Sequence, residues 1–206
     1  SLGVNNSFNF LKKLGFKHLT ADDVNLSSLG LGGTHNGITT IESAAAYAIF
    51  GNGGLYYEPT LYTKVTDKRG EIVLEQNTKP VVAISEDTAT VMNHLLQQVV
   101  KRGTGAGAEI KGFDVFAKTG TTSDNKDHWF IGVTPYYSTA VWWGYDHPAE
   151  LSVNYTTHPP TTAWRKSHCL PVSMILLSGA TSWRALAMTP STMPIRSPAS
   201  PPARST

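Results

Sequence analysis

The stretch FDVFAKTGTTSDNKDHWFIGV, residues 113–133, decides the fold of this chain. Its two ends, Phe113 to Lys118 and His128 to Val133, predict strands, and residues 139–145 predict a third strand in the same way. Short polar or proline-containing turns separate the three runs, which favours antiparallel neighbours. We therefore expect an antiparallel sheet that carries Lys118.

Two capping signals upstream of this stretch predict helices. Thr39 and Glu42 have the spacing of a capping box at the start of an alanine-rich run that is apolar nearly all round. Ser85 is placed to cap a longer helix, which Gly103 would end. The stripe that this second helix is expected to bury consists of Val91, Leu95, Leu96 and Val99.

Two further elements complete the expected fold. The residues before Gly15 read as the last turns of an amphipathic helix with a glycine C-cap. Residues 61–67 and 71–75 alternate on either side of a turn at residues 68–70, which predicts a β-hairpin. The fold class predicted from these patterns is α+β, an antiparallel sheet packed with helices.

The composition excludes several classes of function. The 206 residues are 40% hydrophobic, which is enough for one buried core, and the net charge of +2 includes no dense basic stripe that would indicate a nucleic-acid partner. No apolar run approaches the roughly 18 residues of a membrane span. Cys169 alone cannot form an internal disulfide, and the seven histidines lack paired ligand spacing. We therefore expect neither a metal nor a cofactor.

The last quarter of the sequence differs in character from the rest. All 15 acidic residues lie before residue 151, and beyond about residue 166 the chain becomes rich in Ser, Thr, Pro and Arg without amphipathic periodicity. Such a composition is typical of a disordered tail. Translation out of frame would also produce it. We therefore divide the chain into a domain over residues 1–150 and a tail over residues 151–206.

The motifs around Lys118 resemble those of a known family. Lys-Thr-Gly belongs to the signature set of penicillin-binding proteins and class A β-lactamases. Over most of residues 9 to 150, the chain resembles the transpeptidase domain of class A, or bifunctional, penicillin-binding proteins. The matching segments are Leu31-Gly32-Gly33, Gly37-Ile38-Thr39, Gly51-Asn52-Gly53-Gly54, the hairpin from Lys64 to Gly70, Gly103-Thr104-Gly105, Ala117 to Thr122, Asp127 to Pro135, and Val141 to Asp146.

The resemblance implies an acyl transfer. An active-site serine attacks the D-alanyl-D-alanine bond of a peptidoglycan stem peptide, and an amine of a neighbouring strand resolves the acyl-enzyme; β-lactams mimic the dipeptide. Lys118 and Thr119 would bind the substrate carboxylate by charge-assisted hydrogen bonds. Gly120 would let an extended peptide lie along the strand edge. In the family, the N–H of Thr121 is an oxyanion-hole donor, and the Thr121 hydroxyl contacts the carboxylate.

The family's nucleophile, in a Ser-x-x-Lys motif, and its Ser-x-Asn motif normally precede the Leu31-Gly32-Gly33 turn. Here Ser123–Lys126 is the only Ser-x-x-Lys sequence, and Ser7-Phe8-Asn9 also fits Ser-x-Asn. We interpret both as coincidences. Ser123 lies in the loop that leaves the Lys118 strand, whereas the family's motifs come from separate elements. Ser7-Phe8-Asn9 runs straight into the helix end before Gly15, which in relatives lies beyond the true motif. We therefore expect a partial domain, catalytically inactive by itself. The glycine-rich run at residues 103–107 follows a helix, which argues against a phosphate-binding loop.

The resemblance also implies a parent protein and leaves rivals open. The parent would be a bacterial cell-wall synthase anchored in the cytoplasmic membrane, facing outward, with a glycosyltransferase domain upstream and a place in a cell-wall synthesis complex. One rival is another serine D,D-peptidase or β-lactamase-like hydrolase, which would share the Lys-Thr-Gly motif. The other is a non-catalytic module that binds stem peptide without cleaving it.

Overall fold

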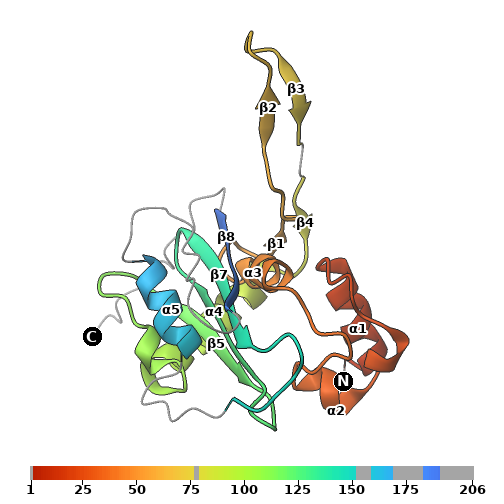
Figure 1. The fold of residues 1–206 in the computed structure, drawn as a ribbon, viewed down its shortest axis with the longest axis vertical. Helices are drawn as coiled ribbons and strands as arrows, with labels where there is room; N and C mark the ends of the chain where they lie inside the picture. Colours follow the sequence, from red (N-terminus) through yellow and green to blue (C-terminus); the bar gives the residue numbers. More distant parts are fainter. Residues whose placement is uncertain (1, 77–78, 152–158, 169–182, 191–206) are drawn as a thin grey trace, which may run out of the picture.

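A four-stranded antiparallel sheet with helices packed around it forms the body of the molecule (Figure 1). The computed structural model describes residues 2–76, 79–151, 159–168 and 183–190. The strand order is β5-β6-β7-β8, with β5 at Phe116–Thr121, β6 at Asp127–Val133, β7 at Tyr137–Gly144 and β8 at Trp183–Pro190. The antiparallel sheet with its helices confirms the α+β prediction.

The first strand of the sheet lies three residues later than the sequence pattern indicated. Strand β5 was expected at residues 113–118 and spans Phe116–Thr121, so the whole Lys-Thr-Gly motif lies within it. The shift follows from pairing, because Thr119 and Thr121 are β-branched residues that lie opposite Phe130 and His128 of β6. The motif is therefore part of the sheet itself.

Helix α3 covers one face of this sheet. It spans Thr40–Ala48, and Thr39 and Glu42 form the predicted capping box at its start. Its Ala44 packs against Ile131 of β6 and Ala140 of β7. Across the same contact the buried hydroxyl of Ser138 donates a hydrogen bond to the carbonyl oxygen of Ala44, at 2.6 Å. These contacts fix α3 on the face that also bears the side chain of Lys118, which lies opposite Ile131.

The other face of the sheet carries the largest cluster of buried side chains. Phe130 and Val141 of the sheet pack there with Val100 of α4 (Glu86–Arg102) and Trp164 of α5 (Pro159–His168). The rings of Phe130 and Trp164 lie with their centroids 5.2 Å apart. A side chain at Gly132 would collide with the Trp164 ring, because an added Cβ would lie 2.5 Å from it. Glycine at this position therefore lets α5 approach the sheet.

Helix α4 buries only part of the stripe that its sequence indicated: Leu96 is buried and Val99 half-buried as expected. Val91 and Leu95, expected in the buried stripe, are each 58% exposed. The residues that the helix buries are Ala89, Leu96, Gln97 and Val100. The amide of Gln97 can be buried because it donates to Asn93 Oδ1 at 2.8 Å, so the stripe includes a polar residue that hydropathy alone assigns to the surface.

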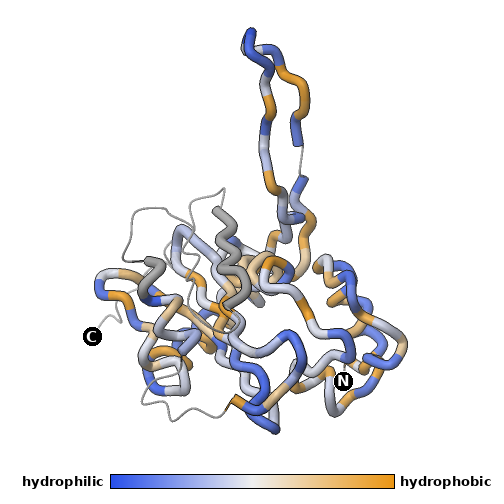
Figure 2. Tube along the Cα trace, in the orientation of Figure 1, coloured by the Kyte–Doolittle hydropathy of each residue, from blue (hydrophilic) through white to orange (hydrophobic). Residues whose placement is uncertain are grey.

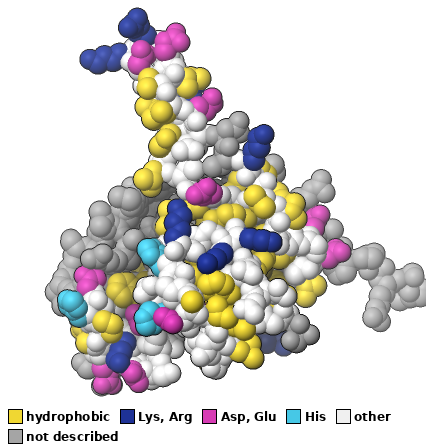
Figure 3. All heavy atoms as spheres, turned by 90° about the vertical axis from the view of Figure 1, so that its right-hand side faces the viewer, with side chains coloured by type: hydrophobic (Ala, Val, Ile, Leu, Met, Phe, Trp, Pro, Cys, Tyr) yellow, Lys and Arg dark blue, Asp and Glu magenta, His cyan; other side chains and the backbone are white. Residues whose placement is uncertain are grey.

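The predicted hairpin projects away from the body (Figure 1). Strands β2 (Lys64–Thr66) and β3 (Ile72–Glu75) pair antiparallel, and Gly70 in the turn has a φ of 88°. At the base, β1 (Leu55–Tyr56) pairs with β4 (Val81–Val82). The tip is hydrophilic (Figure 2), while hydrophobic side chains are exposed along its length (Figure 3). The hairpin prediction is confirmed.

Short elements at the N-terminal end form a small cluster that also contacts residues of α3 through Phe16. Helix α1 spans Val4–Lys13, and Gly15 follows it with a φ of 78°, as expected for a glycine that ends a helix. Phe8 of α1 packs with Leu29 of α2, which spans Leu26–Gly30.

Two 3₁₀ turns, η1 (Ala21–Asp23) and η2 (Ala106–Ala108), complete the described structure.

Residues 151–206, which the sequence analysis treated as a tail, contain helix α5 and strand β8. The sequence analysis did not predict a helix at residues 159–168. Pro159 and Pro160 nevertheless suit the first turn of a helix, because N–H groups have no partner within the helix there and proline lacks this group. The boundary at residue 150 and the two accounts of the tail stay predictions. Cys169 lies outside the described residues.

Replacing Trp164 tests whether α5 belongs to the same folded unit as the sheet. Trp164→Ala would empty a fully buried site between α5 and β6, so we expect the free energy of unfolding to fall by about 3–5 kcal/mol. Urea denaturation followed by circular dichroism measures this loss. Tyr136→Ala, at a side chain that is 60% exposed, is the control and should cost far less. Equal stabilities for wild type and Trp164→Ala would contradict the packing of α5.

Glu42 should make stability depend on pH. Burial opposes ionisation of Glu42, but hydrogen bonds from the backbone N–H groups of Thr39 and Lys17 outweigh it and hold its pKa below the usual 4.5. The stabilisation is therefore complete above about pH 4.5 and is lost as the pH falls through the folded-state pKa.

Comparing Glu42→Gln with wild type measures this contribution. We expect the variant to be less stable at pH 7 and the difference in the free energy of unfolding to shrink as the pH falls below 4.5. Glu71→Gln, at an exposed position of the hairpin, is the control. A difference that stays constant between pH 7 and pH 3 would contradict the role of the ionised carboxylate.

Candidate functional site

The candidate site is the outer edge of β5, where Lys118, Thr119, Gly120 and Thr121 follow one another. Among the described residues β5 pairs only with β6, so its other edge is open. The side chains of Lys118 and Thr121 are exposed, and Thr119 and Gly120 are half-buried. The structure thus brings all four sequence-predicted site residues to one sheet edge.

The hydrogen-bond pattern shows which backbone groups this edge presents. The N–H of Thr122 donates to the carbonyl oxygen of Asp127 at 3.2 Å, which makes these two residues a hydrogen-bonded pair of the antiparallel ladder. Because such pairs alternate with non-hydrogen-bonded ones, Gly120 points its backbone groups toward β6. Thr119 and Thr121 then point their N–H and C=O groups away from the sheet. These are the groups that an added strand would pair with.

Lys118 places a cation over this edge. Its Nζ donates a hydrogen bond of 2.7 Å to the carbonyl oxygen of Thr119, one of the outward-pointing groups. The ammonium is therefore held beside the strand, where it could also bind a carboxylate.

Gly120 permits close contact between the two strands. It lies opposite Trp129, and a Cβ added to it would lie 3.2 Å from the Cβ of Trp129, tighter than ordinary van der Waals contact. A larger residue would push the two strands apart at the centre of the motif. Glycine therefore lets β5 and β6 lie close together at this point.

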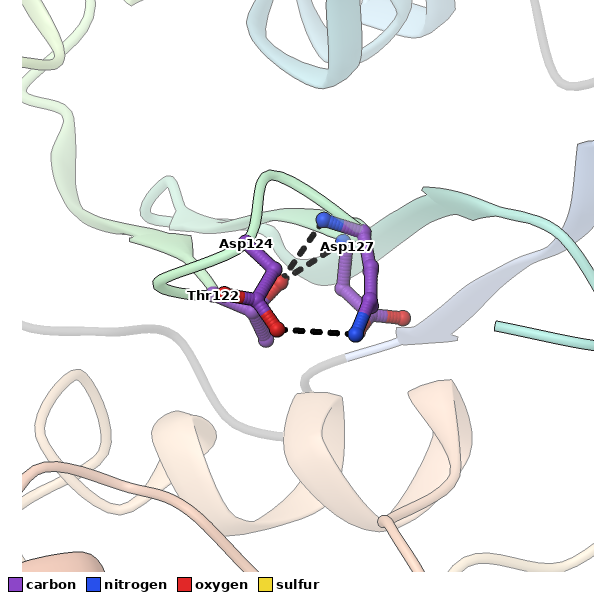
Figure 4. A network of polar contacts seen from close by, with 4 residues as sticks. Thr122, Asp124 and Asp127 are labelled. Atoms are coloured by element: carbon purple, nitrogen blue, oxygen red, sulfur yellow. Dashed lines mark hydrogen bonds and ion pairs between the residues drawn. The ribbon is translucent and has the colours of Figure 1, made fainter. Parts of the chain in front are cut away.

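The turn after β5 is held by a network of polar contacts (Figure 4). Thr122 Oγ1 accepts hydrogen bonds from the N–H groups of Lys126 and Asp127, at 3.0 and 2.9 Å. Asp124 forms an ion pair of 2.8 Å with Lys126, and Asn125 has a φ of 52°. On the next strand, the indole N–H of Trp142 donates to Asp127 Oδ1 at 2.8 Å. The network fixes the register in which β6 supports β5.

The same network bears on Ser123, the only serine with a lysine three residues later. The hydrogen bond and the charge of Asp124 raise the pKa of Lys126, so this ammonium stays protonated and cannot take a proton from Ser123 at neutral pH. Ser7 lies within α1, where its hydroxyl donates to the carbonyl oxygen of Gly3. Ser123 thus lies in the turn after β5 and Ser7 in α1, and the interpretation of both motifs as coincidences stays a prediction.

Thr104 lies next to the motif in the structure, and the sequence analysis gave it no role. Its Oγ1 lies 2.6 Å from the Oγ1 of Thr119. The Gly103-Thr104-Gly105 segment was noted as a family motif, but its contact with Thr119 depends on how α4 ends. Spacing along the sequence carries no signal for it.

The described residues contain neither a cluster of metal-ligating side chains nor a membrane-spanning helix. There, no group of three or more His, Cys, Asp and Glu side chains could hold a metal ion. In the same residues, no helix has both the length and the apolar character that crossing a membrane requires.

Comparisons with known proteins agree on one family. Residues 9–156 match the family model described as penicillin binding protein transpeptidase domain. Penicillin-binding protein 1A of Clostridium acetobutylicum is 44% identical over 153 residues, which are 74% of this chain and 19% of that protein. This chain therefore spans about a fifth of the length of that relative.

Solved structures show the same fold. The penicillin-binding protein 1A structure from Haemophilus influenzae aligns with a TM-score of 0.62 and 20% identity, covering 94% of this chain and 38% of that one. The PonA1 protein from Mycobacterium tuberculosis, solved in complex with penicillin V, aligns with a TM-score of 0.59 and 25% identity. That alignment covers 93% of this chain and 54% of that one.

The turn network generates a prediction about the stability of the sheet. Thr122→Val keeps the shape of the side chain but removes the acceptor for two backbone N–H groups, so we expect a loss of about 1–2 kcal/mol in the free energy of unfolding. Thr122→Ser retains the hydroxyl and should recover most of this loss. Urea denaturation of the three proteins provides the measurement, and equal losses for Val and Ser would show that the hydroxyl is not the important group.

Proposed function

This chain belongs to the family of penicillin-binding protein transpeptidase domains, and from that premise we propose that it binds the acyl-D-alanyl-D-alanine end of a peptidoglycan stem peptide during D,D-transpeptidation. The observation that carries the proposal is the open edge of β5, where the backbone groups of Thr119 and Thr121 point away from the sheet. A stem peptide in extended conformation adds to this edge as a further antiparallel strand.

The side chains of the edge suit a substrate that ends in a carboxylate. Lys118 provides a fixed positive charge, and the hydroxyls of Thr119 and Thr121 provide hydrogen-bond donors. When substrate binds, the Lys118 ammonium exchanges its contact with the Thr119 carbonyl oxygen for a contact with the anion. Penicillins carry a carboxylate next to a strained amide, so the same groups would bind them.

The backbone of Thr121 has a separate role in the proposed reaction. The acyl transfer passes through a tetrahedral intermediate whose oxyanion needs fixed N–H donors. The N–H of Thr121 points out of the edge and is held there by the pairing of Thr122 with Asp127. This direction supports its assignment as one oxyanion donor. The serine that becomes acylated is a residue other than Ser123.

The setting of the domain is also part of the proposal. The relatives reported above are penicillin-binding proteins, which favours cross-linking of stem peptides over the hydrolase that the Lys-Thr-Gly motif alone leaves open. We place the reaction at the extracytoplasmic face of a bacterial cytoplasmic membrane, in a protein with a glycosyltransferase domain and within a cell-wall synthesis complex. Residues 1–150 then form the transpeptidase part of this chain.

Acylation by a fluorescent penicillin tests the proposal on the complete product of the gene that carries this sequence. We expect a covalent adduct, and we expect Lys118→Met to lower the second-order rate of acylation by about 10- to 100-fold, because a hydrogen bond to a charged group is lost. Lys111→Met, at an exposed lysine outside the motif, is the matched control and should leave the rate unchanged. Absence of an adduct, or equal rates for both variants, would refute the proposal.

A further inference from the structure

The Gly103-Thr104-Gly105 segment forms a turn that packs against the last turn of α4. The N–H groups of Gly103 and Gly105 both donate to the carbonyl oxygen of Val99, at 3.1 and 3.0 Å. A Cβ added to Gly103 would lie 3.0 Å from that oxygen, and one added to Gly105 would lie 3.3 Å from it. Both contacts are tight, so the two glycines let the chain fold back over the helix terminus and carry Thr104 with it.

A second set of contacts fixes this turn against β5. Ala108 of η2 is fully buried in the cluster that also contains Ala117, the residue just before Lys118. Its N–H donates to the carbonyl oxygen of Gly105 at 2.9 Å, which ties the turn to that buried position. The hydroxyl of Thr104 is thereby held 2.6 Å from the hydroxyl of Thr119.

The chemistry of two hydroxyls at this distance depends on which one donates. A threonine hydroxyl has one proton, and Thr119 needs that proton to bind a carboxylate. If Thr119 donates to Thr104, its proton is already used. If Thr104 donates to Thr119, the Thr119 proton is free for the ligand, and the two bonds strengthen each other because each polarises the next.

We propose that Thr104 is a positioning residue that donates its hydroxyl proton to Thr119 Oγ1 and thereby directs the Thr119 proton at the carboxylate of a bound D-alanyl-D-alanine peptide. This inference rests on the proposed function and adds a residue to its binding site. Thr104 acts through Thr119 and need not touch the ligand. Because Thr104 is exposed, the hydroxyl pair is not required to satisfy a buried group, and its removal should change ligand binding more than stability.

The experiment is a binding titration of the 206-residue chain, followed by NMR. The ligands are N-acetyl-D-alanyl-D-alanine with a free carboxylate and the same peptide with a C-terminal amide. The variants are Thr104→Val, Thr104→Ser, Thr119→Val and the double variant with Val at both positions. Thr66→Val, at an exposed threonine of the hairpin, is the matched control, and thermal unfolding of every variant monitors stability.

We expect Thr104→Val to weaken binding of the carboxylate peptide by about 3- to 10-fold, the range for one net hydrogen bond. Thr104→Ser should bind as wild type does, and the amide peptide should lose little affinity with either variant. In the double variant, Thr104→Val should add nothing to the loss caused by Thr119→Val, because the two hydroxyls act as one unit.

The outcomes separate this inference from the function on which it rests. If the wild-type chain binds the carboxylate peptide and Thr104→Val binds equally well, the inference is overturned and the proposed function stands. Additive losses in the double variant, or equal losses for the carboxylate and amide peptides, also overturn it. If the wild-type chain does not bind the carboxylate peptide, the peptide-binding role of β5 fails, and the inference fails with it.

Discussion

The site depends on the open edge of one strand. An edge strand with outward-pointing N–H and C=O groups invites pairing with any extended chain, and proteins usually protect such edges. Here no strand of the described residues pairs with β5 at Thr119 and Thr121, while Lys118 donates to the Thr119 carbonyl oxygen and places a charge beside it. Lysine at an edge opposes unspecific pairing. A ligand that brings a carboxylate can engage that charge and gain access to the backbone.

The rest of the structure supports this edge in three ways: through β6, through the packing on the two faces of the sheet, and through the end of α4. On one side, β6 is kept in register by the Thr122–Asp127 network, to which Trp142 of β7 is also bonded. The two faces of the sheet are covered by α3 and by the cluster around Phe130 and Trp164. The end of α4 also supports the edge, because the turn that follows it places Thr104 against Thr119. A site made of backbone groups needs this support, because a small change in strand position would move every group at once.

Sequence predicted those parts of the fold that local chemistry decides. The capping box of Thr39 and Glu42, the glycine after α1 and the projecting hairpin each depend on residues a few positions apart. The predicted buried stripe of α4 was right for Leu96 and wrong for Val91 and Leu95, because the burial of Gln97 depends on its bond to Asn93 and on what α4 packs against. Helix α5 was not predicted, because its Trp164 is buried by contacts with Phe130 and Gly132, which are distant in the sequence. The same limit applies to the site, where the motif was recognisable but the contact between Thr104 and Thr119 was not.

The position of the motif in the sheet also explains why consecutive residues can serve one ligand. Positions alternate between the two faces of a strand, so Lys118 and Gly120 lie on the sheet face that α3 covers, whereas Thr119 and Thr121 lie on the opposite face. A ligand lying on either face would meet only half of the motif. A ligand that approaches the edge lies between the two faces and can reach side chains from both, together with the backbone groups between them. The four adjacent residues of the proposed site can therefore reach one ligand only because β5 is the last strand on its side of the described sheet.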